Sequence, residues 1–228
     1  MKDKNKIIGH INTVFTHKKW VAYYCFKCGL YWWGIKHDLS KFSPTEFWES
    51  VQYYTGTRSP IDACKEAKGV SYAWMHHKGR NSHHYEYWVD NLDKGGIPVM
   101  MPFEDSVEFI CDSLGAARAY MGKDFTFFKE LKWWMNKLDS NPRMHVKSKQ
   151  FFTMIFFKLA KNKSNIKNIL NKEYMLIHYD AIAISATEDS LQELLNKVKE
   201  FIDKEENKDA QRSGNSWWNN SWNLNEKR

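Results

Sequence analysis

The sequence predicts an all-α fold, a helical bundle with additional helices toward its C-terminus and a disordered tail. Apolar residues recur every three or four positions along most of the chain, which is the period of an amphipathic helix. Helix-capping motifs open several of these segments, and strands should be marginal. We expect a main helical domain over residues 5–140, a helical extension over 141–203 and a disordered tail over 204–228.

The first predicted helix covers residues 7–28, and Gly29 ends it. Its apolar line repeats at three-, four- and seven-residue intervals and consists of Ile8, Ile11, Phe15, Ala22 and Cys25. His17 lies off that line, on a face shared with Thr13 and Tyr24. His17 is therefore either a solvated surface histidine or a residue that faces a second buried environment.

Two helix starts follow, and both carry a serine-proline pair. The sequence SPTE at residues 43–46 is a capping box with proline at the first helical position, so a helix should run to about Tyr54. The sequence SPID at residues 59–62 repeats this pattern and predicts a helical segment interrupted near Gly69. The turn between them leaves Arg58 either free to reach a ligand or solvated.

Pro102 begins another predicted helix, which ends at Met121 before Gly122. Asp112 points away from its apolar stripe, a direction that ordinarily means solvent. The other residues on that face are Glu108, Gly115, Ala116 and Ala119. Because most of them are small, another element should pack closely there. We therefore regard Asp112 as a candidate ligand in preference to a plain surface aspartate.

Further helices are predicted over residues 127–138, 147–160 and 190–202, with a chain-breaking segment at 139–142. The pattern of residues 174–184 is apolar but does not settle the type of element. Most of the many aromatic residues lie at helical spacing, so a core built from large side chains accounts for them.

Composition limits the classes of function. The chain has 228 residues and a formal charge of +7, which suits a phosphate-bearing partner and permits nucleic acid without favouring it. The four cysteines show no disulfide pattern and the sequence opens with no signal peptide, so we expect a cytoplasmic protein. The one C-x-x-C pair, at residues 25–28, is explained by helix packing. The longest apolar run, residues 151–157, is too short to cross a bilayer, so we expect no membrane partner.

The segment WMHHKGRNSHHYEYW at residues 74–88 is the strongest sign of a functional site. It holds four of the nine histidines, in two pairs on either side of a glycine-containing turn, and they are His76, His77, His83 and His84. Such pairs can point several imidazoles into one volume, where Lys78, Arg80 and Asn81 could hold an anion. The alternative is a surface loop whose histidines are solvated.

A His37-Asp38 pair lies upstream, followed three residues later by Lys41. Imidazole offers a neutral nitrogen, while a carboxylate has two oxygens and can bridge two cations. The dipeptide alone is a weak signal. It gains weight from the order of the whole set, in which His17 comes first, the histidine cluster follows and Asp112 comes last.

This order resembles the HD-domain superfamily of metal-dependent phosphohydrolases. The segment HDLSK at residues 37–41 looks like the HD-x-G-K form of its motif, with Ser40 where glycine is usual. More narrowly, HDLSKF, HHKGRNSHHYEYW and MPFEDSVEFICD are similar to a family of bacterial and phage proteins of unassigned function. The similarity covers roughly residues 10–135.

The resemblance implies an HD-like bundle over residues 5–140 with two divalent metal ions, drawn from Mn, Fe, Zn, Ni and Co. One ion would be held by His17, His37, Asp38 and Asp112. Asp38 would bridge to the second ion, held by two or three of the histidines at 76, 77, 83 and 84. Thr13 replaces the glutamate that some three-metal relatives carry, so we expect two ions.

The implied activity is hydrolysis of a phosphoester in a small nucleotide or cyclic nucleotide. Asp38 and Lys41 would be catalytic, and the groups that bind substrate would be Arg58, Lys78, Arg80 and Asn81. Two alternatives stay open. One is an HD-type di-iron oxygenase with nearly the same ligands, and the other is a non-catalytic, metal-stabilised binding protein for nucleic acid or protein.

Overall fold

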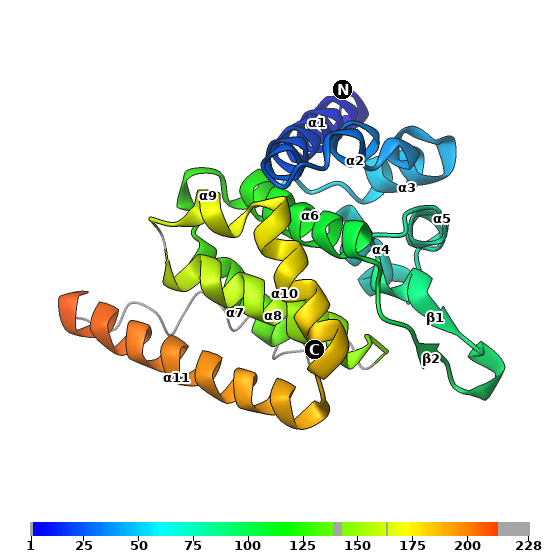
Figure 1. Ribbon diagram of the computed structural model, residues 1–228. Helices are drawn as coiled ribbons and strands as arrows, with labels where there is room; N and C mark the ends of the chain where they lie inside the picture. The colour runs from blue at the N-terminus through cyan, green and yellow to red at the C-terminus, as the bar shows by residue number, and fades with distance from the viewer. Residues whose placement is uncertain (1, 139–142, 163, 214–228) are drawn as a thin grey trace.

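The computed structural model describes residues 2–138, 143–162 and 164–213, and within them the all-α prediction is confirmed (Figure 1). The helices are α1 (Lys2–Lys27), α2 (Tyr31–Lys36), α3 (Pro44–Tyr53), α4 (Pro60–Lys68), α5 (Tyr72–Arg80), α6 (Phe103–Met121), α7 (Phe127–Leu138), α8 (Val146–Lys161), α9 (Ile166–Ile169), α10 (Lys172–Ser185) and α11 (Glu188–Ser213). Short 3-10 helices cover Leu39–Phe42, Tyr85–Trp88, Leu92–Lys94 and Gly122–Asp124.

Helix α6 runs through the middle of the molecule, between the N-terminal helices α1 to α3 and the C-terminal helices (Figure 1). One buried cluster of apolar residues extends from α1 through α6 to α7, α8 and α11. Its largest members include Tyr24, Trp134, Phe151, Phe152 and Phe156. The aromatic residues in this cluster are therefore core residues, as their helical spacing indicates.

Helices α1 and α6 approach each other closely at Gly115. A Cβ atom there would lie 2.5 Å from Val21 Cγ2 and 3.4 Å from the carbonyl oxygen of His17, both on α1. The small residues on the Asp112 face of α6 therefore do mark a packing surface, as predicted. This close approach brings the side chains of His17 and Asp112 together.

The predicted helix starts of α3 and α4 are also found. The Ser43 Oγ atom accepts a hydrogen bond of 3.4 Å from the backbone N–H of Glu46, and α4 ends at Gly69, whose φ of 78° is in the left-handed region. Gly79 differs from expectation, because it lies within α5 and not in a turn between the histidine pairs. Helix α5 continues to Arg80, and Asn81 is its C-cap.

The described strands form one small hairpin, in which β1 (Val89–Asp90) pairs antiparallel with β2 (Ile97–Pro98), with Val89 opposite Pro98. Toward the C-terminus, the apolar residues 174–184 are helical and belong to α10. Helix α11 continues to Ser213, so residues 204–213 of the predicted tail are helical. The rest of that tail, 214–228, and the predicted breaker at 139–142 lie outside the described residues.

No described helix is both long enough and apolar enough to cross a membrane. The division into a domain at 5–140 and an extension at 141–203 stays a prediction. The buried cluster includes residues from both ranges, among them Val107 of α6 and Val198 of α11.

Candidate metal centre

The His37-Asp38 pair occupies the turn between α2 and the 3-10 helix Leu39–Phe42. Asp38 has φ 53° and ψ 31°, the left-handed region that aspartate tolerates better than most residues. Both side chains are 1% exposed or less. The turn thus directs a buried imidazole and a buried carboxylate to the same point, facing α1 and α6.

Four side chains from three parts of the chain meet at this point. His17 Nε2 of α1 lies 3.2 Å from His37 Nε2 and 3.0 Å from Asp112 Oδ1 of α6. Asp38 Oδ2 lies 3.4 Å from His17 Nε2 and 3.1 Å from His37 Nε2, and Asp112 Oδ1 is 3.3 Å from His37 Nε2. The four atoms thus surround one small volume.

These separations match those between adjacent ligands of a single cation. A metal ion that binds nitrogen and oxygen at about 2.1 Å holds neighbouring ligands about 3.0 Å apart in an octahedron and about 3.4 Å apart in a tetrahedron. All five distances lie between 3.0 and 3.4 Å. The donor set of two imidazoles and two carboxylates suits Mn, Fe, Zn, Ni or Co.

A second group shares Asp38 through its other oxygen. Asp38 Oδ1 lies 3.3 Å from His77 Nε2 and 3.5 Å from His83 Nε2, and His84 completes the set. The Nε2 atoms of His83 and His84 are buried and have no hydrogen-bond partner in the described part of the chain. Buried polar atoms without partners are costly, so this set of donors fits a bound cation.

Two glutamates orient these imidazoles, and neither was among the predicted site residues. Glu108 Oε1 lies 2.8 Å from His37 Nδ1 and 3.4 Å from His83 Nδ1. Glu46 accepts hydrogen bonds of 2.7 Å from the Nδ1 atoms of both His76 and His77. An ionised carboxylate only accepts, so each of these Nδ1 atoms carries a proton, and Nε2 is the nitrogen of His37 and His77 that is left to bind a cation.

Sequence signals for both glutamates existed. Glu108 precedes Asp112 by four residues and shares its face of α6, one helical turn away. Glu46 stands at the capping-box position of α3, where its carboxylate would turn back to the Ser43 N–H. In the structure that N–H bonds to the Ser40 carbonyl and the Glu46 carboxylate holds histidines instead.

Electrostatics keep the carboxylates ionised and His84 neutral. Burial opposes protonation of His37, but Asp38, Asp112 and Glu108 outweigh it and raise the pKa of His37 well above 6.5, so a cation at Nε2 would have to displace a proton. Burial opposes ionisation of Asp38, but His37 and Lys41 outweigh it and hold the Asp38 pKa well below its usual range. Burial likewise opposes ionisation of Glu108, and hydrogen bonds from His37 and His83 lower its pKa to about 2. Burial and the neighbouring imidazoles hold the pKa of His84 well below 6.5, so His84 is neutral at pH 7, the form in which an imidazole can bind metal.

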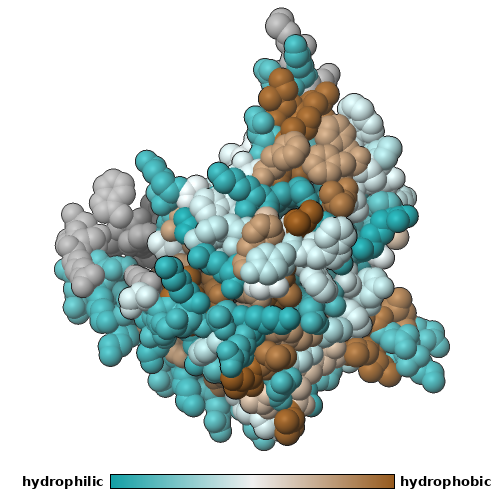
Figure 2. Space-filling view, turned by 45° about the horizontal axis from the view of Figure 1, so that its top comes forward, coloured by the Kyte–Doolittle hydropathy of each residue, from teal (hydrophilic) through white to brown (hydrophobic). Residues whose placement is uncertain are grey.

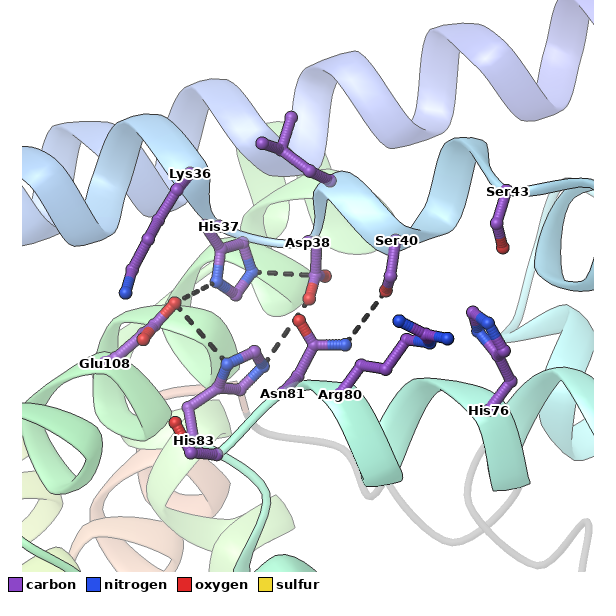
Figure 3. A pocket seen from close by; sticks show the side chains of 12 residues that line it. Lys36, His37, Asp38, Ser40, Ser43, His76, Arg80, Asn81, His83 and Glu108 are labelled. Atoms are coloured by element: carbon purple, nitrogen blue, oxygen red, sulfur yellow. Dashed lines mark hydrogen bonds and ion pairs between the residues drawn. The ribbon is translucent and has the colours of Figure 1, made fainter.

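A cavity of about 600 Å³ opens onto these groups. Figure 3 shows Arg80 and Asn81 projecting from α5 toward the turn that carries Asp38. Asn81 Nδ2 donates to Ser40 Oγ at 2.9 Å and to the His77 carbonyl at 2.7 Å. Lys41 Nζ lies 2.5 Å from Asp38 Oδ2, so a fixed positive charge stands next to both groups of donors.

Two predicted substrate-binding residues lie away from the cavity, and one predicted metal ligand lies outside the donor groups. Arg58 forms an exposed two-pronged ion pair with Glu66, with both N–O distances 2.6 Å. Lys78 lines a separate cavity beside Glu86, because residues 76 and 80 share one face of α5 and residue 78 points to another. His76 lines the main cavity but belongs to no described group of metal donors.

The described chain therefore contains buried groups of histidine, aspartate and glutamate that could hold metal ions. They are His17, His37, Asp38 and Asp112; Asp38, His77, His83 and His84; and His37, His83 and Glu108. The third overlaps the first two, and its glutamate faces Nδ1 atoms, which suits an orienting role. Seven of the eight predicted metal ligands belong to the first two groups, and the ligand roles themselves stay predictions.

Of three comparisons with known proteins, one gives a match. No curated protein and no solved structure matches the chain significantly. A family model matches residues 6–171, which include every residue of the donor groups and both orienting glutamates. The chain belongs to the family of unknown function DUF5662.

Proposed function

We propose that the protein is a metal-dependent phosphohydrolase with a dinuclear centre, acting on a phosphoester of a small nucleotide. The observation that carries this proposal is the position of Asp38. One of its carboxylate oxygens faces His17 and His37, and the other faces His77 and His83. A carboxylate shared in this way is a natural bridge between two cations, and paired cations are common in phosphoester hydrolysis.

When bound, two such ions supply an activated water and stabilise charge on the phosphoester oxygens. The chain supplies the remaining charge complementarity. The cavity is lined by Arg80, Lys36 and Asn81, so two cations and an amide face the space where an anion would bind, and Lys41 adds a third positive charge beside Asp38. Arg80 is suited to two-pronged binding of a phosphate, while Lys41 acts as a point charge.

The size of the cavity agrees with a small substrate. A volume of about 600 Å³ lies within the range of about 300–1,000 Å³ typical of pockets for small ligands. Ionised carboxylates accept hydrogen bonds and cannot donate one to an anionic substrate. The groups that can bind such a substrate are therefore the cations, together with Asn81 and Ser40 at the cavity wall. This arrangement favours a compact anionic group.

The test is turnover of mono-, di- and cyclic nucleotides by protein loaded with Mn, Fe, Zn, Ni or Co in turn, followed by phosphate release and chromatography. Arg80→Ala should lower kcat/KM by at least about tenfold with metal content unchanged. Arg58→Ala is the matched control, because Arg58 pairs with Glu66 on the surface, and it should retain activity.

Two results would overturn the proposal. Dioxygen consumption by the iron form on an organic substrate, without phosphate release from any nucleotide, would establish an oxygenase. Stoichiometric metal binding without turnover in either assay would establish a binding protein whose metal is structural.

A further inference from the structure

The surface formed by α1, α2 and the adjoining 3-10 helix carries many large apolar side chains open to solvent. We call this surface the N-terminal apolar face, and it comprises Ile8, Phe15, Phe26, Tyr31, Trp32, Ile35, Leu39 and Phe42, each between 42% and 63% exposed. Figure 2 shows hydrophobic residues gathered near the end of the molecule that carries the N-terminus. Aromatic rings of neighbouring elements are in contact. The ring centroids of Phe15 and Phe42 lie 5.7 Å apart, and those of Phe26 and Tyr31 lie 5.5 Å apart.

The face is too large to be an ordinary patch of solvent-exposed surface. If each of its eight side chains leaves on the order of 100 Å² open, together they expose about 800 Å². The largest apolar patch on a typical monomer is about 300–600 Å². An apolar surface of this size indicates a binding partner.

Charge around the face limits the chemistry of that partner. Lys4 and Lys19 lie on the same side of α1 as Ile8 and Phe15, at helical spacing, and both lysines are exposed. Lys36 is exposed at the end of α2. Between residues 4 and 45 the sequence has one carboxylate, Asp38, and it is buried. The face is therefore cationic as well as apolar, and it suits an anionic partner.

We propose that the N-terminal apolar face docks onto an anionic lipid bilayer surface. Tryptophan, tyrosine, aliphatic residues and lysines together are typical of elements that lie at the membrane interface. Protein–protein interfaces instead are enriched in arginine and depleted in lysine, and the sequence has no arginine before Arg58. A second copy of this chain would bring two cationic faces together, and residues 4–45 offer no exposed carboxylate to pair with those cations.

Docking at the bilayer surface departs from the expectation of no membrane partner. That expectation rested on the lack of an apolar run long enough to span a bilayer, and docking at the surface requires no such run. It also places the cavity at the bilayer surface. Leu39 of the face and Lys36 at its edge both line the cavity that opens onto Asp38. The metal centre would therefore open close to the lipid headgroups.

The experiment is flotation of the full-length protein with vesicles of phosphatidylcholine alone and with vesicles that also contain phosphatidylserine. We expect binding to the anionic vesicles only, and weaker binding as salt is raised, because salt screens the lysines. The double variants Trp32→Ala/Ile35→Ala and Lys4→Ala/Lys19→Ala should each bind at least about tenfold more weakly. Circular dichroism and metal content should stay at the wild-type level in both.

The matched controls are Ile184→Ala on α10, where the isoleucine is 86% exposed, and Lys197→Ala on the exposed side of α11. Both should bind vesicles like the wild type. Equal binding by the wild type and the two double variants would overturn the proposal, as would no flotation of the wild type. A wild-type dimer in solution that Trp32→Ala/Ile35→Ala converts to a monomer would overturn it in favour of a second copy.

Discussion

The Nδ1 atom of His37 lies 2.8 Å from Glu108 Oε1, on the side of the ring opposite the Nε2 atom that faces Asp38 and Asp112. The hydrogen bond fixes the tautomer of His37 and the rotation of its ring at the same time. Because Glu108 also lies 3.4 Å from His83 Nδ1, one carboxylate orients an imidazole in each of the two donor groups.

Replacing Glu108 should therefore weaken metal binding at both groups. Glu108→Ala should lower affinity by about 10–100-fold, since removal of such orienting partners typically has this effect. Glu108→Gln keeps an oxygen that accepts from Nδ1 and should have a smaller effect. Calorimetric titration of metal-free protein measures both. Glu104→Gln, in the first turn of the same helix, is the control, and an equal loss there would contradict a specific role.

Replacing Glu46 should affect one group only. Its carboxylate holds His77 and His76, and of these only His77 belongs to a donor group. Glu46→Ala should therefore bind one ion with nearly normal affinity and the second about 10–100-fold more weakly. Plasma mass spectrometry after dialysis would show this as a fall in stoichiometry. Glu66→Gln on the surface of α4 should leave the metal content unchanged, and loss of both ions from Glu46→Ala would refute the separation of the two groups.

The sequence sufficed for the helices because periodicity and caps are local properties of the chain. The order of motifs along the chain also pointed to His17, Asp38 and Asp112, which the structure brings into one group of possible donors although they are far apart in sequence; their roles as ligands stay a prediction. The sequence could not say which histidine of the cluster faces Asp38. That depends on the rotation of α5 and on its extension to Arg80, which places His77 inward and His76 toward Glu46.

The second limit concerned side chains with two roles. Glu46 fits a capping box and Arg58 fits a loop near a ligand, yet Glu46 holds histidines and Arg58 pairs with Glu66. A local sequence pattern predicts the role that a residue would have within its own helix or loop. It does not predict which distant side chain the packing of the helices brings within reach. The structure supplies those partners.

Gly115 should be intolerant of any side chain. A Cβ atom there would lie 2.5 Å from Val21 Cγ2 and 3.0 Å from the Val21 backbone nitrogen, so Gly115→Ala must push α1 from α6. We expect a loss of about 1–3 kcal/mol in the free energy of unfolding, by urea titration, and weaker metal binding, because His17 moves with α1. Gly79→Ala is the control. No described atom lies within 4 Å of its added Cβ, so this helical site should gain stability by up to about 1 kcal/mol.

Glu130 should make the metal-free protein less stable as pH rises. Burial raises the pKa of Glu130 to about 8 from 4.5, and Ser113 donates a hydrogen bond to its carboxyl group. Since the folded state holds the proton more tightly, its stabilising contribution is complete below about pH 4.5 and is lost as pH rises to about 8. The loss is roughly 3–5 kcal/mol.

Glu130→Gln tests this account, because glutamine has the same shape and no titratable proton. Urea unfolding of metal-free protein should show similar stability for wild type and variant near pH 4.5, and a more stable variant at pH 8. Parallel stability profiles across this range would show that Glu130 ionises freely in the folded protein.

Asp38 offers the sharpest test of the centre, provided that the substitution respects its backbone. Its φ of 53° is left-handed, a region that asparagine tolerates as aspartate does and in which alanine is strained by about 1–3 kcal/mol. Asp38→Asn therefore removes the charge of the carboxylate that the two donor groups share while sparing the turn. Asp38→Ala combines that change with backbone strain, so a loss of metal from Asp38→Ala alone has two explanations.

We expect Asp38→Asn to lose both ions and to keep the helical circular dichroism of the wild type. Each ion loses a charged ligand, because Asp38 Oδ2 faces His17 and His37 and Oδ1 faces His77 and His83. His37→Gln should instead remove chiefly the ion beside His17, since Nε2 of His37 faces that group alone. Plasma mass spectrometry distinguishes the two patterns. Retention of one ion by Asp38→Asn would show that the carboxylate does not join the two groups, and would remove the main support for a dinuclear centre.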